Sequence, residues 1–325
     1  MSKRAMRVIA GVVASALTCG VLVERAAAWE AGYLVGTFPG ITLGLPMGAN
    51  PPPGVYLTNL GNYGTDVFTG HGTAGPAGAS LGEVGAKIDL GQYVPVLTWS
   101  TPWTILGATW SMTVIQPMIT SSFYEPGGAI ISNPAGLHNI ILNPFNLSWE
   151  LAPGFFGALG LDVIPPTGRI SGATGLANWG QPIVTIEPRV SFSYLADGWN
   201  ITSSFRFGVN TVNTYTGVTD GAYLHTDLTL AKKFDKWELG AVAYGVNQIA
   251  ADSNCGSKPA GYCAYGEDVA LGGLVGYDFG PASVKVIVTD SVYTRNFAGG
   301  WRVYTQLAFP LWVDQPAKPF VAAKF

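Results

Sequence analysis

The chain has 325 residues, of which 48% are hydrophobic and only 11% are charged. Soluble domains carry about 25% charged residues, so this composition argues against an ordinary soluble protein. The formal net charge of −3 disfavours a nucleic-acid partner, which would require an excess of basic residues. A chain of this length can bury a core as one or two domains.

A secretory signal is predicted over residues 1–28. A basic leader is followed by an apolar stretch from Val8 to Val23 and by the small residues Ala26 to Ala28, which form a cleavage site. The apolar stretch is shorter than the roughly 20 residues that a membrane-spanning helix needs. Four of the 17 basic residues and one of the 20 acidic residues lie in this leader, so the mature chain carries 13 against 19.

Apolar and polar residues alternate one by one from Trp199 to Asn210. A period of two belongs to a strand with two chemically different faces. The same alternation recurs along the mature chain, and we expect the polar face, including Lys87 and Asp89, to point into a lumen. Twelve strands are predicted, at 54–65, 82–99, 103–119, 145–152, 155–164, 182–195, 199–212, 222–234, 237–249, 268–279, 282–293 and 301–312.

The connections between these strands alternate in length. Long connections are expected at 66–81, 120–144, 165–181, 213–221, 250–267 and 294–300, and short ones at 100–102, 153–154, 196–198, 235–236 and 280–281. Short periplasmic turns and long outer loops are typical of outer-membrane barrels. The sequence therefore predicts an all-β fold, a transmembrane antiparallel up-and-down β-barrel of about 12 strands over residues 54–312 in the cell outer membrane.

A soluble β-sandwich would show the same alternation, with its apolar face toward a core. Two observations weigh against it. Many of the predicted strands have 10 to 14 residues, whereas strands of soluble proteins usually have about 5 to 6. Tryptophan rings, which favour membrane interfaces, cluster near strand ends at Trp99, Trp103, Trp199, Trp237, Trp301 and Trp312.

Segments outside the barrel carry further expectations. Residues 29–53 are rich in proline and glycine and cannot form a ladder strand, because proline lacks the backbone donor. We expect a linker there, and an inward-folded plug is the alternative. Residues 313–325 are expected to form a periplasmic tail. Cys255 and Cys263 are expected to form a disulfide in an outer loop, because an exported chain favours a bridge over a metal site.

Short motifs give the chain a resemblance to a known family. These motifs are P-P-P-G-V-Y at 51–56, L-S-W at 147–149, P-T-G at 166–168, N-W at 178–179, N-T-V-N-T-Y-T-G at 210–217, H-T-D at 225–227, G-Y-D-F-G at 276–280 and L-A-F-P-L at 307–311. In order and spacing they resemble the phenol-degradation meta-pathway family of outer-membrane proteins. The resemblance implies an outer-membrane barrel that transports phenol-like aromatics, and it carries over no binding or catalytic residue.

The polar face supplies the candidate site residues. Seven charged or titratable residues are expected to converge on the lumen: Glu187, Arg189, Arg206, His225, Asp227, Lys285 and Arg302. His225 and Asp227 could hold a phenolic hydroxyl by donating and accepting a hydrogen bond. The alternative is that all seven are salt-bridged residues that only stabilise a narrow barrel.

The function expected from these features is passive uptake of small hydrophobic or aromatic compounds, by a monomer without cofactor or metal. The expected partners are the lipid bilayer, the solutes and the barrel-assembly machinery. One alternative is a structural or surface-interaction barrel with a plugged lumen. Another is an outer-membrane lipid hydrolase, which is disfavoured because no G-x-S-x-G motif occurs and two of the three histidines, His71 and His138, lie in expected surface loops.

Overall fold

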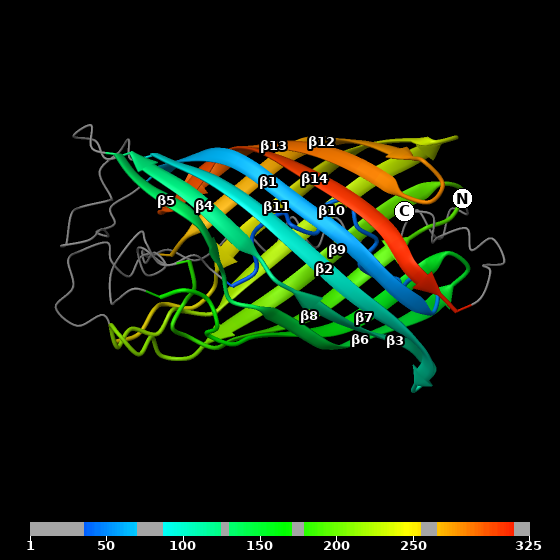
Figure 1. The fold of residues 1–325 in the computed structure, drawn as a ribbon, viewed down its shortest axis with the longest axis horizontal. Coiled ribbons are helices and arrows are strands. Elements are labelled where there is room, and N and C mark those ends of the chain that lie inside the picture. Colours follow the sequence, from blue (N-terminus) through cyan, green and yellow to red (C-terminus); the bar gives the residue numbers. More distant parts are fainter. Residues whose placement is uncertain (1–35, 70–86, 125–129, 171–178, 255–264, 315–325) are drawn as a thin grey trace.

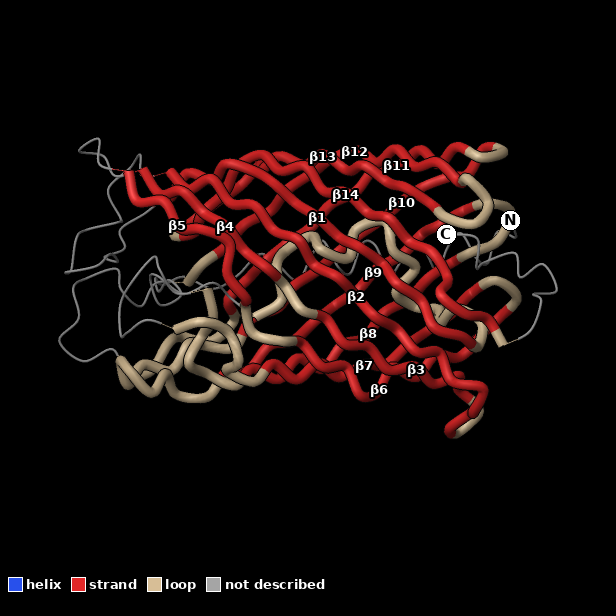
Figure 2. The backbone as a smooth tube through the Cα atoms, in the orientation of Figure 1, coloured by secondary structure: helices blue, strands red, loops and turns tan. Residues whose placement is uncertain are grey.

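The protein folds as a closed antiparallel β-barrel with an irregular segment inside it (Figures 1 and 2). The computed structural model describes residues 36–69, 87–124, 130–170, 179–254 and 265–314. Within these ranges, no helix is long and apolar enough to cross a bilayer.

Fourteen strand segments form the wall in the described part of the chain. They are β1 (Gly54–Thr69), β2 (Lys87–Ile105), β3 (Ala108–Ile115), β4 (Met118–Tyr124), β5 (Ile130–Leu137), β6 (Ile141–Ala152), β7 (Phe155–Ile164), β8 (Thr185–Tyr194), β9 (Trp199–Asn210), β10 (Tyr223–Phe234), β11 (Trp237–Gln248), β12 (Glu267–Asp278), β13 (Ser283–Arg295) and β14 (Phe297–Val313). Both β3 and β4 pair with β2, and on their other side they pair with β6 and β5. We therefore count β3 with β4 as one interrupted strand and β5 with β6 as another. The barrel thus has twelve strands, as predicted.

The two broken strands are interrupted at the same level. Pro117 separates β3 from β4 and has no backbone donor to continue the ladder. Its carbonyl instead accepts a 2.9 Å hydrogen bond from the backbone amide of His138, and the side chain of Gln116 donates to the carbonyl of His138 at 2.9 Å. These bonds cross the break and join the two interrupted strands.

The barrel closes where β14 pairs with β1, from Gly54 opposite Val313 to Thr69 opposite Phe297. A bilayer offers no water to unpaired backbone groups, so a spanning sheet must close in this way. The first strand starts and the last strand ends beside the short turns, at the end that we call the short-turn end. The opposite end, where the longer connections lie, is the long-loop end (Figure 1).

Three predicted connections are wrong. Residues 120–144 hold most of the β4–β5 hairpin, Asn296 alone separates β13 from β14, and the first tight turn lies at Leu106-Gly107 instead of 100–102. The sequence of β5, I-I-S-N-P-A-G-L, contains a proline and a glycine and lacks clear alternation. Its position at the edge of the sheet accommodates the proline.

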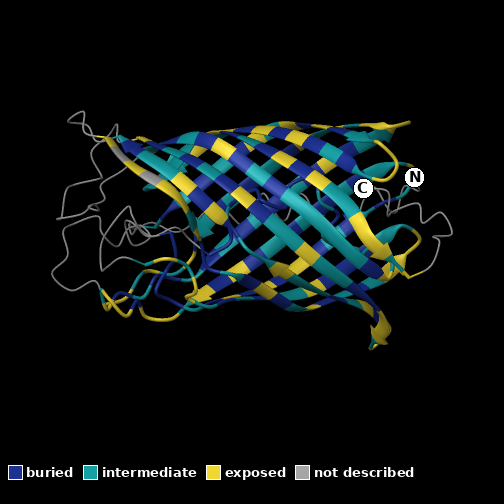
Figure 3. Ribbon diagram, viewed as in Figure 1, coloured by how far each residue is buried: buried dark blue, intermediate teal, exposed yellow. Residues whose placement is uncertain are grey.

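Burial alternates along the strands (Figure 3). In β9 the side chain of Arg206 is 3% exposed and the next residue, Phe207, is 40% exposed, so the polar face of this strand points inward. The prediction for β2 is wrong, because Ile88 and Leu90 are buried and Asp89 is on the outer face. Alternation separates two faces, but it does not say which face points inward where the lumen itself is apolar.

Aromatic side chains gather on the outer face near both ends of the barrel. Trp99 and Trp103 pack edge to face with ring centroids 5.5 Å apart, and Trp103 continues to Trp110 at 6.1 Å. Near the long-loop end, Tyr63 packs against Trp301 at 6.0 Å. Such rings belong at the two interfaces of a bilayer.

Candidate functional site

Residues 36–53, which we call the inner segment, lie inside the barrel (Figure 2). The expectation of a linker is therefore wrong, and the inward-folded alternative describes this segment. It folds back on itself through tight turns, in which Leu43 donates to the carbonyl of Gly40 and Leu45 to that of Thr42, each at 3.1 Å. Leu43 is fully buried and packs against inward-facing residues of β10–β14.

Two lumen carboxylates bind the first part of the inner segment. Glu187 accepts hydrogen bonds from the backbone amide of Thr37 at 3.1 Å and from its hydroxyl. Asp227 accepts from the backbone amides of Gly40 and Thr42, each at 3.2 Å, and from the Thr42 hydroxyl. Loop backbone buried in a barrel needs such partners, because its own amides cannot reach water.

Side-chain donors from other strands bind the carbonyls of the same segment. Lys285 on β13 donates to the Gly44 carbonyl and Gln306 on β14 to the Leu43 carbonyl, each at 2.6 Å. The guanidinium of Arg302 lies 4.5 Å from the ring centroid of Phe38, within the range of a cation–π contact. The segment is therefore held from several sides of the lumen.

The last part of the inner segment is fixed near the short-turn end. Gly48 donates to the hydroxyl of Ser193 at 2.9 Å and accepts from Ser148 at 2.7 Å. The side-chain oxygen of Asn50 accepts from Ser111 at 2.8 Å and from an amide of β6 at 2.5 Å. These bonds leave the segment anchored close to the start of β1.

All seven predicted lumen residues are buried in the barrel: Glu187, Arg189, Arg206, His225, Asp227, Lys285 and Arg302. Several form ion pairs, as the stabilising alternative anticipates. Asp162 lies 3.6 Å from both Arg189 and Arg206, and Arg206 lies 3.7 Å from Asp227. Lys285 pairs with Glu238 at 2.9 Å, and Arg302 pairs with Asp66.

Sequence reasoning missed Asp162 and Asp66. Asp162 is a single acidic residue inside the otherwise apolar strand β7, where it lies opposite Glu187 in the register with β8. A charge isolated among apolar neighbours is the signal that could have identified it. The partners of Asp66 and Asp162 come from other strands, so the pairs themselves cannot be seen in the sequence.

His225 and Asp227 are both buried inside the barrel. The imidazole of His225 packs on the ring of Tyr223 with centroids 4.6 Å apart. The carboxylate of Asp227 is occupied by Gly40 and Thr42. A phenolic hydroxyl bound by this pair would first have to displace the inner segment.

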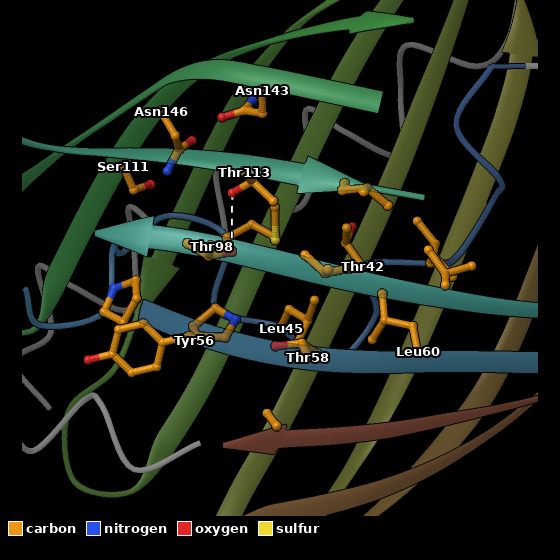
Figure 4. A pocket seen from close by; sticks show the side chains of 18 of the residues that line it. Thr42, Leu45, Tyr56, Thr58, Leu60, Thr98, Ser111, Thr113, Asn143 and Asn146 are labelled. Carbon is orange, nitrogen blue, oxygen red and sulfur yellow. Dashed lines mark hydrogen bonds between the residues drawn. The ribbon is translucent and has the colours of Figure 1, made fainter. Parts of the chain in front are cut away.

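A cavity of about 490 Å³ lies between the inner segment and one side of the wall (Figure 4). Aliphatic side chains of β1–β3 line much of it, and with Ile41 of the inner segment they form a contiguous patch made of Leu60, Val94, Val96 and Ile115. On the same wall, Thr98 of β2 and its register partner Thr113 of β3 share a 3.1 Å hydrogen bond. The inner segment forms its polar contacts mainly with other strands, so this side of the wall faces open space.

The two ends of the cavity differ in chemistry. Asn143, Asn146, Asp162, Arg189 and Arg206 line one part of it, near the middle of the barrel. Toward the short-turn end it is lined by the turn between β12 and β13 and by the end of β14, through Gly280, Pro281, Ala282, Phe309 and Pro310. The cavity therefore extends from mid-barrel to the short-turn end.

His138 is buried, although the sequence suggested a surface position. Its Nδ1 contacts the carbonyl of Trp179. Cys255, Cys263 and His71, together with residues 1–35 and 315–325, lie outside the described residues. Among the residues that the structure describes, no group of His, Cys, Asp and Glu is arranged to hold a metal ion.

Residues 69–307 match the model of a family described as "Putative MetA-pathway of phenol degradation". The chain belongs to this family. The resemblance suggested by the sequence motifs is thereby confirmed, and together with the closed twelve-stranded barrel it makes the chain an outer-membrane protein. A search of curated proteins gave no match.

Three solved structures are similar to this chain to different degrees. An outer membrane channel from Pseudomonas putida F1 has a TM-score of 0.64 at 10% identity, over 81% of this chain and 97% of that chain. The β domain of the Bordetella autotransporter BrkA has a TM-score of 0.48 at 10% identity, over 79% and 99%. A FadL homologue from Pseudomonas aeruginosa has a TM-score of 0.37 at 10% identity, over 88% and 97%.

Proposed function

We propose that the protein is an outer-membrane channel for passive uptake of small hydrophobic or aromatic compounds that feed their degradation. The observation that carries this proposal is the cavity of about 490 Å³ beside the inner segment. Pockets of about 300–1,000 Å³ with mostly apolar walls and a few polar groups are typical small-molecule sites. An apolar cavity of about 150 Å³ already accommodates benzene, so one substituted ring fits.

The route that we propose runs along the aliphatic side of the lumen. A solute that enters from the long-loop end meets Asn143, Asn146 and the two arginines, and then passes Leu60 and Val94 toward the short-turn end. The inner segment narrows this route, so passage requires it to shift. We propose that this step is diffusion, without an energy source, a cofactor or an enzymatic reaction.

A structural or surface-interaction barrel is the second candidate, and the inner segment favours it. Polar contacts fix this segment to β6, β8, β10, β13 and β14. A segment that never moved would leave a cavity without passage. The two candidates therefore differ in whether solutes cross.

Uptake measurements separate the two. Cells that express the chain should accumulate radiolabelled benzyl alcohol at a several-fold higher initial rate than cells that differ only in lacking it. The purified protein should also produce current steps in planar bilayers. Unchanged uptake together with an electrically silent bilayer would favour the structural barrel.

We also propose a monomer, inserted by the barrel-assembly machinery with the short-turn end in the periplasm.

A further inference from the structure

The mid-barrel part of the cavity contains two arginines that face each other. Arg189 on β8 and Arg206 on β9 are direct partners in the antiparallel register. Both line the cavity, and their side chains are at least nine-tenths buried. Like charges directly opposite each other destabilise a strand pair, so this arrangement needs negative charge close by.

Three buried carboxylates lie around the pair, and they also bind other groups. Glu187, on the same strand as Arg189, accepts hydrogen bonds from the inner segment. Asp162 is the carboxylate that lines this part of the cavity, and it lies 3.6 Å from each guanidinium. Asp227 lies 3.7 Å from Arg206, and it also accepts three hydrogen bonds from Gly40 and Thr42. These ion-pair distances exceed the range of about 2.7–3.2 Å for a good N–H···O hydrogen bond.

The arginines also have more donors than the structure uses. Arg189 donates to Asn146 at 2.7 Å, and Arg206 donates to the hydroxyl of Thr42 at 3.5 Å. In the described part of the chain, the Nε–H groups of both arginines are buried without a hydrogen-bond partner. Each guanidinium carries five N–H donors in a planar fork that matches a carboxylate. The pair is therefore suited to an additional anionic acceptor.

The apolar part of the cavity fits the ring of a molecule that carries such an anionic group. Beyond the arginines the wall is aliphatic, with Leu60, Val94 and Ile115. A ring packed against these side chains is removed from water, and a carboxylate attached to the ring reaches the guanidinium groups. Inorganic anions and aliphatic hydrocarbons would each use only one of the two surfaces.

We propose that Arg189 and Arg206 dock the carboxylate of a single-ring aromatic acid, whose ring packs on the aliphatic wall formed by β1–β3. This inference rests on the proposed function and narrows its solute class from small hydrophobic or aromatic compounds to aromatic anions. The paired arginines hold the head group at mid-barrel, and the ring extends toward the short-turn end.

Calorimetric titration of the full-length protein in detergent at neutral pH tests this assignment. The probes are benzoate, benzyl alcohol (the ring without the charge) and acetate (the charge without the ring). Benzoate should bind at least about tenfold more tightly than either of the others, because charge-assisted hydrogen bonds contribute more than neutral ones. Equal affinity for benzoate and acetate would overturn the role of the aliphatic wall.

Substitutions locate the site. Arg189→Gln and Arg206→Gln should each weaken benzoate binding about tenfold or more and leave benzyl alcohol binding unchanged. Arg295→Gln is the matched control, since this arginine pairs with Glu267 at the barrel end with a side chain 40% exposed. It removes the same charge from the protein and should change neither affinity. Heat-modifiable migration on gels verifies that each variant forms a closed barrel.

The outcomes separate this inference from the proposed function. If benzyl alcohol and benzoate bind with equal affinity and the glutamine variants have no effect, the arginine site is wrong and uptake of aromatics stands. If neither aromatic binds and neither enters cells, both proposals fail. A selective loss of benzoate binding in the two variants supports both.

Discussion

Asp227 connects the wall of the barrel to the inner segment at the scale of a single residue. Three donors of the segment converge on its carboxylate, and Arg206 lies beside it. Each of these buried donors would lose its acceptor if the carboxylate were removed. An unsatisfied buried donor costs about 1–3 kcal/mol, so this one side chain contributes strongly to keeping the segment in place.

Asp227→Ala is therefore expected to release the inner segment. Single-channel recordings in planar bilayers should show larger or more frequent current steps than the parent protein. Asp290→Ala is the control. This substitution removes the same charge, but Asp290 is on the exposed face of β13. Identical conductance distributions for parent and Asp227→Ala would show that the segment does not limit the channel.

The inner segment is held by its backbone conformation as well as by its partners, at the scale of an element. Gly40 and Gly44 have φ angles of 73° and 77°, a region that costs other residues about 1–2 kcal/mol. A Cβ at Gly44 would also lie 2.7 Å from Leu274 of β12. The glycines thus permit both the tight turns and the close approach to the wall.

Gly44→Ala should loosen the segment. Amide hydrogen exchange of peptides from residues 36–53, followed by mass spectrometry, should become about tenfold faster, which corresponds to a loss of about 1.4 kcal/mol. Gly107→Ala is the matched control, since Gly107 has a φ of 79° with open space around it in the β2–β3 turn. If both variants left the exchange of 36–53 unchanged, the close approach at Gly44 would not matter.

Closure of the wall depends on the seam between β1 and β14, at the scale of the whole molecule. Gly64 lies in this seam, where a Cβ would come within 2.3 Å of the carbonyl oxygen of Trp301 and 3.1 Å of the Cα of Arg302. Both are backbone atoms of β14 and cannot move aside without disturbing the pairing. The seam therefore requires a residue without a side chain at this position.

Gly64→Val should impair closure of the barrel, because overpacking costs about 1–3 kcal/mol. The measurement is the fraction of protein with heat-modifiable gel migration after refolding into detergent. Gly245→Val is the control on β11, where the nearest atom to an added Cβ is the side chain of Asn247 at 3.5 Å. Equal folded fractions for the two variants would contradict the requirement at the seam.

Much of the wall could be predicted from the sequence, because lipid on one side and a polar lumen on the other impose strict alternation. This holds for β8, β9 and β10, whose bounds agree with the prediction to within a few residues. It fails for β5, which is an edge strand with a proline, and for the inward direction of Ile88 and Leu90 in β2. In β2 the apolar side chains point into the lumen, so an apolar face does not identify the lipid-facing side of that strand.

The site was predictable only in part. Charged residues in the middle of strands identified the buried groups around Arg206 and Asp227, because only a lumen can hold them in a membrane protein. The folded position of residues 36–53 could not be predicted, since its partners are remote in the chain. The bond from Lys285 to Gly44, for example, joins residues 241 positions apart.

This separation has a consequence for the order of assembly. The inner segment precedes β1 and is made first, yet its donors and acceptors need side chains from β8 to β14. Those strands surround it only once β14 has met β1. The contacts of the segment with all of these strands can therefore be complete only once the seam has formed, so closure of the wall and fixing of the segment are coupled.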